Sequence, residues 1–212
     1  MTALTHPRSA GLWWRWTGWV TAGETLGFSI PALAGALTAT APTIVSMPVL
    51  LAAGACEGAL LGAAQAHVLH HVLPSVPRRG WIAATSAGAV VAWFLGLLPS
   101  AFADRVAGWP IFLLVLAGAA LGTALLLSIG VAQWTVLRRR VDRAGRWIAV
   151  TAVGWLAGLA VFMLVAPPLW HEGQPVAALA SVGAVAGLTM AGTVAAVTGL
   201  GLVRLLDGEA RR

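Results

Sequence analysis

The sequence predicts an all-α membrane protein that crosses the bilayer six times. Of its residues, 59% are hydrophobic and only 9% are charged, whereas a soluble domain carries about 25% charged residues. Apolar runs of about 20 residues, the span of a bilayer core, recur along the chain. Lipid offers no partners to backbone N–H and C=O groups, so segments of this length must be helical. These features predict a single membrane domain over residues 1–212.

Each predicted helix is an apolar run bounded by Pro, Gly or charged residues. In chain order the runs cover 16–39, 48–73, 80–98, 109–137, 146–166 and 176–206. The first run has no clear small-residue cleavage site, so we expect a retained helix rather than a signal peptide. The connections at 41–47, 99–108 and 167–175 are too short for a folded external domain.

Arginine placement predicts the orientation. All 13 basic residues are arginines, and only Arg105 falls on the side opposite the termini. The positive-inside rule therefore predicts cytoplasmic termini in a multi-pass protein of the cell membrane. Nucleic-acid binding is not indicated, because the arginines flank apolar segments instead of forming a basic stripe.

Tryptophans follow the same topology. We interpret the tryptophans near the helix ends as interfacial belts. At or near the predicted cytoplasmic ends these are Trp13, Trp14, Trp16, Trp19, Trp81, Trp134 and Trp147, and at the outer ends they are Trp109 and Trp170. Trp93 and Trp155 fall in the middle of helices, where packing or lipid contact is the simplest interpretation.

An internal repeat groups the helices into pairs. Ten residues recur at matching positions, namely Gly62, Ala64, Gln65, Val68, Leu69, Trp81, Ile82, Ala83, Thr85 and Gly88 as Gly130, Ala132, Gln133, Val136, Leu137, Trp147, Ile148, Ala149, Thr151 and Gly154. A fainter third copy places Glu24 opposite Thr85, and Thr198 opposite Gln65. The repeat predicts three parallel helical hairpins, at 16–73, 80–137 and 146–206, around an axis along the membrane normal. A pseudo-threefold bundle would result.

The repeated pattern, a Gln followed by Val-Leu and Arg with Trp-Ile opening the next helix, resembles uncharacterised multi-pass bacterial membrane proteins with repeated helix pairs. The resemblance covers 62–154. It implies a location in the bacterial inner membrane and implies no activity.

Glycines recur at helical spacing on several runs, for example at Gly54, Gly58 and Gly62, and again at Gly118 and Gly122. Such small-residue faces let helices approach closely in lipid. We favour packing within one chain, and the alternative is a homo-oligomer or a partner in a membrane complex.

Glu24 is the most suggestive single residue, because a charged carboxyl inside a membrane helix costs about 3 kcal/mol. It is interpreted either as a proton or cation site or as a protonated side chain that hydrogen-bonds a neighbouring Gln or Thr. Glu57 is a second intramembrane carboxyl. We expect several turns between the two, which argues against a carboxylate dyad.

The repeat places further polar side chains at a similar depth, and we predict that they form one layer with Glu24: Gln65, Gln133, Thr85, Thr151 and Thr198. The layer is a candidate site for a small polar substrate. The favoured interpretation is that it holds the helices in register through hydrogen bonds worth about 1 kcal/mol each.

The remaining residues with reactive side chains do not indicate a catalytic or metal-binding site. His67 and His71 have the spacing of a two-histidine metal site, but no third ligand is evident, so we interpret them as the basic end of a helix. Cys56 is interpreted as a small buried apolar residue. No catalytic motif or phosphate-binding loop occurs, so no cofactor is identified and an enzyme is not favoured.

Three functions follow from these observations, in order of preference. The first is a small permease or channel-like carrier for a small solute or ion. The second is a non-catalytic membrane subunit or scaffold of a larger complex, and the third is a membrane enzyme acting on lipid-soluble substrates.

Overall fold

The computed structural model describes residues 6–210, and within them the chain is all-helical. The helices are α1 (His6–Leu37), α2 (Thr43–Val72), α3 (Arg78–Ala101), α4 (Ala103–Val106), α5 (Ile111–Leu137), α6 (Arg146–Leu169) and α7 (Val176–Ala210). Six of them are long and apolar enough to cross a membrane, and only α4 is short. The prediction of six long apolar helices that could cross a membrane is confirmed, and the chain fits a multi-pass integral membrane protein.

Two helices start five or more residues earlier than the apolar pattern predicts. α1 begins at His6, ten residues before the predicted start at Trp16, and α2 begins at Thr43 rather than Pro48. Pro31 and Pro48 both lie inside their helices. Because α1 starts earlier, each of its residues lies farther from the start of the helix than the apolar run predicts. This difference affects where Glu24 lies in the site described below.

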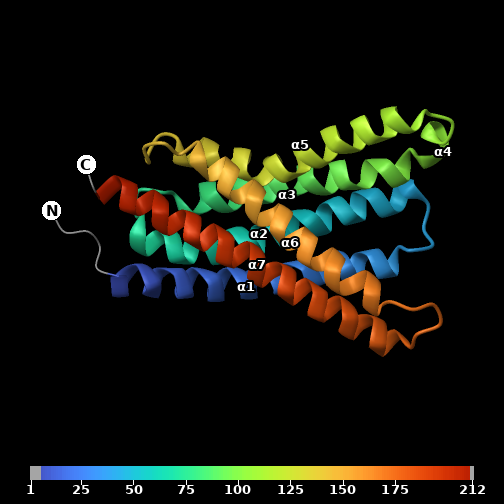
Figure 1. Ribbon diagram of the computed structural model, residues 1–212, viewed down its shortest axis with the longest axis horizontal. Helices are drawn as coiled ribbons and strands as arrows, with labels where there is room; N and C mark the ends of the chain where they lie inside the picture. Colours follow the sequence, from blue (N-terminus) through green and yellow to red (C-terminus); the bar gives the residue numbers. More distant parts are fainter. Residues whose placement is uncertain (1–5, 211–212) are drawn as a thin grey trace.

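The six long helices form a closed ring. Each contacts the next along the chain, and α7 returns to contact α1. The start of α1 and the end of α7 lie at the same end of the bundle, which we call the terminal end (Figure 1). The opposite end, which carries α4 and the α1–α2 and α6–α7 loops, is called the far end. Toward the far end α5 and α6 diverge (Figure 1).

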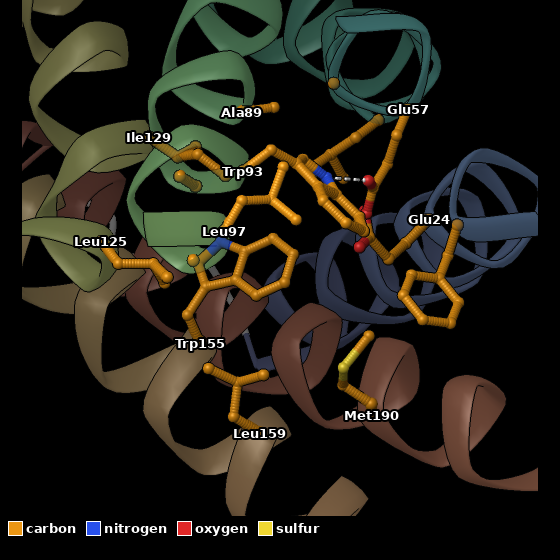
Figure 2. A pocket seen from close by; sticks show the side chains of 15 residues that line it. Glu24, Glu57, Ala89, Trp93, Leu97, Leu125, Ile129, Trp155, Leu159 and Met190 are labelled. Carbon is orange, nitrogen blue, oxygen red and sulfur yellow. Dashed lines mark hydrogen bonds between the residues drawn. The ribbon is translucent and has the colours of Figure 1, made fainter. Parts of the chain in front are cut away.

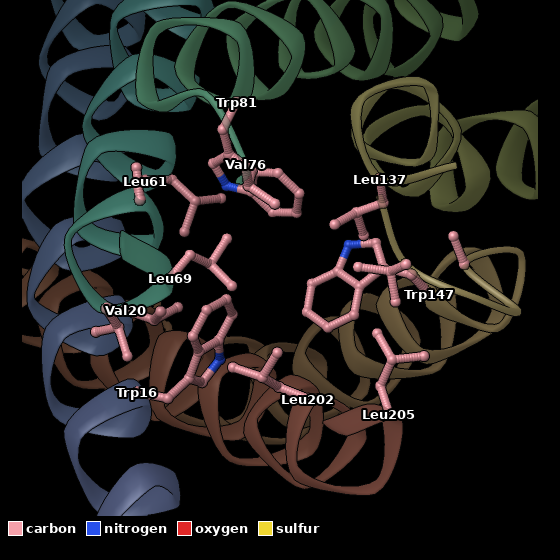
Figure 3. Packing of buried hydrophobic residues seen from close by; sticks show 14 of the residues in the cluster. Trp16, Val20, Leu61, Leu69, Val76, Trp81, Leu137, Trp147, Leu202 and Leu205 are labelled. Atoms are coloured by element: carbon pink, nitrogen blue, oxygen red, sulfur yellow. The ribbon is translucent and has the colours of Figure 1, made fainter. Parts of the chain in front are cut away.

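The main apolar core lies at the terminal end. Trp16 and Trp81 are 0% exposed and Trp147 is 1% exposed. The Trp147 ring lies against both others, with centroid distances of 5.8 Å to Trp16 and 6.0 Å to Trp81. Leu69 and Leu202 pack beside them, so the cluster occupies the axis of the ring (Figure 3). The interpretation of Trp16, Trp81 and Trp147 as part of an interfacial belt is therefore wrong, whereas Trp14, Trp19, Trp109 and Trp170 are exposed.

Glycine allows the closest helix contacts around α2. A Cβ added to Gly58 would lie 2.6 Å from the Cβ of Ala89 on α3, and one added to Gly27 of α1 would lie 3.3 Å from the Cγ of Glu57. By contrast, nothing lies within 4 Å of an added Cβ at Gly118 or Gly122. The glycine contacts hold α1, α2 and α3 together and bring Glu57 next to α1.

Candidate functional site

Three tryptophans donate their indole N–H groups to polar side chains of neighbouring helices. Trp81 Nε1 lies 3.0 Å from Gln65 Oε1, and Trp147 Nε1 lies 2.7 Å from Gln133 Oε1. Trp16 Nε1 lies 3.0 Å from Thr198 Oγ1. We call these three tryptophans and their three partners the tryptophan layer. The pairs join α2 to α3, α5 to α6 and α7 to α1.

Gln133 is the centre of the hydrogen bonding in this layer. Its Nε2 donates to Gln65 Oε1 at 2.7 Å and to Thr85 Oγ1 at 2.9 Å. The Thr85 hydroxyl in turn donates to the carbonyl oxygen of Trp81. The structure thus joins Gln65, Thr85 and Gln133, three of the six residues expected in one polar layer.

The other three residues of the expected layer differ. Thr198 accepts from Trp16 and donates to the carbonyl oxygen of Val194 at 2.7 Å. The buried Thr151 hydroxyl has no hydrogen-bond partner within the described part of the chain. Glu24 is not bonded to the layer and instead faces Glu57 (Figure 2).

Glu24 and Glu57 lie at the same depth, one on each of two neighbouring antiparallel helices. Glu24 follows Trp16 by eight residues, and Glu57 precedes Gln65 by eight, so each lies about 12 Å along its helix from the tryptophan layer. They are 0% and 6% exposed, and their carboxyl groups interact directly. The expectation of several intervening turns is wrong, because α1 extends farther toward the terminal end than predicted and Glu24 therefore lies deeper.

The two carboxyl groups line a cavity of about 280 Å³ on the far-end side of the tryptophan layer (Figure 2). We call it the acidic cavity. Apart from these carboxyls its lining is largely apolar and includes Phe28, Trp93, Leu97, Leu125, Trp155, Leu159 and Met190. Gly96 at its edge is exposed, so the cavity reaches the molecular surface.

The two carboxyl groups have unequal surroundings. Trp93 Nε1 donates to Glu57 Oε2 at 2.6 Å, whereas the oxygens of Glu24 have no partner among the described residues other than the Glu57 carboxyl group. A buried carboxylate without a donor or counter-charge costs several kcal/mol, and two adjacent ones repel each other. Chemically, the pair is therefore suited to holding a proton or a cation between its oxygens.

Sequence reasoning missed the aromatic wall of this cavity. Trp93 and Trp155 were interpreted as packing or lipid-facing residues, yet both line the acidic cavity. One signal was available, because a tryptophan in mid-membrane carries an N–H that needs an acceptor. That requirement points to an intramembrane oxygen, here the Glu57 carboxylate.

The remaining candidates do not form a site. His67 and His71 have ring centroids 5.7 Å apart, and Trp19 lies against His67 at 4.3 Å. Among the described residues, no group of three or more His, Cys, Asp or Glu is placed to hold a metal ion. Cys56 is exposed, contrary to the expectation of a buried residue, because it lies on the outer face of α2 beside the inward-facing Glu57.

The fold and the site together define a multi-pass helical membrane protein with an acidic cavity inside its bundle. No protein-family model matches the chain, and the searches of curated proteins and of solved structures also give no match. The function is therefore argued from the geometry of the site.

Proposed function

We propose that this protein is a small permease or carrier for a small solute or ion, and that the acidic cavity is its substrate site. The observation that carries the proposal is the fully buried Glu24, whose oxygens have no hydrogen-bond partner in the described structure other than the carboxyl group of Glu57, which they face (Figure 2). A glutamate that served only as structural glue would be hydrogen-bonded to a neighbouring Gln or Thr. Glu24 lacks such a bond, which favours a functional role.

The tryptophan layer supports a carrier over an open channel. It occupies the bundle axis between the acidic cavity and the terminal end, about 12 Å from the carboxyl pair. The cavity reaches the surface at Gly96, on the other side of that layer. The opening at Gly96 lies within the candidate membrane span of α3. The cavity is thus closed toward the terminal end and open to the outer surface of the bundle, which is compatible with one state of a carrier and not with a continuous channel.

We propose that the terminal end is cytoplasmic and that the membrane is the cell membrane. Arginines gather at this end, at the start of α3, in the α5–α6 loop and near the end of α7, whereas Arg105 lies at the far end. Reporter fusions in the α2–α3 loop and after α4 test the orientation. A reporter that functions only outside the cell should be inactive at the first position and active at the second.

We further propose that the three hairpins are related by a pseudo-threefold axis. The equivalent bonds of Trp16, Trp81 and Trp147 support this arrangement. They also favour aligning Trp16 with Trp81, so that Val20 rather than Glu24 corresponds to Thr85. Glu24 and Glu57 would then have no acidic counterparts at the matching positions of the other two hairpins.

Transport is tested with the full-length protein in liposomes that carry a pH gradient and an internal pH-sensitive dye. A panel of small solutes is added outside, and solute-dependent loss of the gradient is recorded. Glu24→Gln keeps the side-chain shape and removes the titratable group, so it should abolish the signal. Glu172→Gln, in the exposed α6–α7 loop, is the matched control. Equal fluxes through wild type and Glu24→Gln would contradict the proposal.

The alternative function is a non-catalytic membrane subunit or scaffold. The specific observation in its favour is the packed tryptophan layer, which leaves the terminal end closed by apolar side chains. Purification in a mild detergent tests it, because a subunit should retain a partner at fixed stoichiometry. A third reading, a membrane enzyme on lipid-soluble substrates, would be supported by a lipid-like molecule bound beside Glu57.

A further inference from the structure

We infer that the acidic cavity binds a small hydrophobic ammonium cation, with its charged nitrogen between Glu24 and Glu57 and its apolar part against the aromatic wall. The inference rests on the proposed function, because it takes the cavity as the substrate site. It adds the chemical class of the substrate.

The charge of the cavity lining favours a cation as the ligand. Glu24 and Glu57 are the titratable residues of the cavity lining, and the described residues that line it from α1, α2, α3, α5, α6 and α7 include no Arg or His. An anion would meet two carboxyl groups without a counter-charge, which is unfavourable in an apolar surrounding. A cation would instead supply the positive charge that is missing beside the two carboxyl groups.

The lining favours an organic cation over a metal ion. Calcium takes six to eight oxygen ligands and magnesium requires about six, whereas the side chains lining the cavity offer four carboxylate oxygens, one of them already bonded to Trp93. The remaining surface comes mainly from apolar and aromatic side chains such as Phe28, Trp155 and Met190. Aromatic faces attract ammonium groups that carry apolar substituents, and the attraction increases when water is excluded.

The volume limits the size of the ligand. At about 280 Å³ the cavity lies just below the lower end of pockets that hold drug-sized molecules, which start at about 300 Å³. A single aromatic ring with a short ammonium group, such as benzyltrimethylammonium, is of suitable size.

Cation and proton compete for the same carboxyl pair. Binding of the cation breaks the O–H bond of the proton that the pair holds, and this proton leaves to bulk water as the positive charge of the ligand replaces it. The exchange keeps the charge of the site unchanged. Affinity should therefore fall as the pH is lowered, and transport should exchange one cation for one proton.

Binding of benzyltrimethylammonium is measured by calorimetry on the full-length protein in lipid nanodiscs. Wild type and Glu172→Gln should bind with equal affinity, and Glu24→Gln should bind at least about tenfold more weakly because it removes one of the charges that the ligand meets. Neopentylbenzene, in which carbon replaces the charged nitrogen, should also bind at least about tenfold more weakly. Equal binding to Glu24→Gln, or equal affinity for the neutral isostere, would overturn the inference.

Two further measurements separate misfolding and failed transport from failed binding. Glu24→Asp keeps the carboxyl group, so it should retain more affinity than Glu24→Gln at an equal melting temperature, and the reverse order would overturn the inference. If the cation binds through Glu24 but never dissipates a pH gradient in liposomes, the permease proposal fails and the ligand class stands. If a neutral solute gives a Glu24-dependent flux and the cation does not bind, the ligand class fails and the permease stands.

Discussion

The tryptophan layer and the acidic cavity both bury polar groups inside the same helical bundle, but they satisfy them differently. In the tryptophan layer Gln133 accepts one hydrogen bond and donates two. In the acidic cavity Glu24 is equally buried, and its oxygens have no partner in the described chain other than the second carboxyl group, Glu57. Satisfied polar groups fix the register of helices, whereas an unsatisfied carboxyl is costly and indicates a site that awaits a ligand. Burial alone therefore does not separate structure from function, and hydrogen-bond satisfaction does.

The largest loss of stability is expected for Gln133→Met. Methionine has a similar shape, but it removes three side-chain hydrogen bonds and leaves the Trp147 N–H without its acceptor. We expect a loss of about 2–3 kcal/mol in the free energy of unfolding, measured by denaturation with SDS in mixed micelles. A loss as small as that of an exposed substitution such as Thr135→Val would show that the layer does not hold the helices together.

The three tryptophans should not be equivalent. Trp147→Phe removes a 2.7 Å bond to the central Gln133 and a ring that touches both other tryptophans, so we expect a loss of about 2 kcal/mol. Trp16→Phe should cost about 1 kcal/mol, because its partner Thr198 keeps a bond to Val194. Melting temperatures in one detergent give the order, and a larger effect of Trp16→Phe would contradict it.

Glu24→Gln is the sharpest test of the comparison. An amide at this position can donate a hydrogen bond to Glu57 and cannot be charged, so stability should be unchanged or raised, by up to about 1 kcal/mol. Activity and cation binding should be lost in the same variant. A clear fall in melting temperature would mean that Glu24 stabilises the fold as Gln133 does.

Among the tryptophan substitutions, the smallest loss of stability is expected for Trp93→Phe. Phenylalanine keeps an aromatic wall but removes the donor to Glu57 Oε2, in a region with space beside the ring. We expect a loss of less than about 1 kcal/mol and a change in cation affinity of a few fold. Calorimetry with benzyltrimethylammonium and the melting temperature provide the two readouts. An effect on stability as large as that of Trp147→Phe would contradict this assignment.

The spans of the fold could be predicted because hydrophobic length determines them. Helix starts were less predictable, as α1 shows, because its first ten residues include polar and charged side chains that extend the helix beyond the apolar run. The short α4 in the predicted 99–108 connection was also missed.

The polar residues of the candidate site could be predicted from the sequence, but which of them lie together could not. Glu24, Glu57, Gln65 and Gln133 were recognised because polar side chains are rare in such helices. The position of α1 along its axis relative to α2 depends on contacts such as Gly27 against Glu57 and on the Trp16–Thr198 hydrogen bond. These contacts join segments far apart in the chain, so periodicity within one helix carries no information about them.

The contact between α7 and α1 has a consequence for how this chain can be cut. The loop at 73–77 joins α2 to α3 at the terminal end, where α1 also begins and α7 also ends. A circularly permuted chain, opened in that loop and closed by a short linker between α7 and α1, should rebuild the same ring. The Trp81–Gln65 bond would then join its first and last helices, as the Trp16–Thr198 bond does here. The order of the helices along the chain would then differ, while the ring of contacts between neighbouring helices would stay the same.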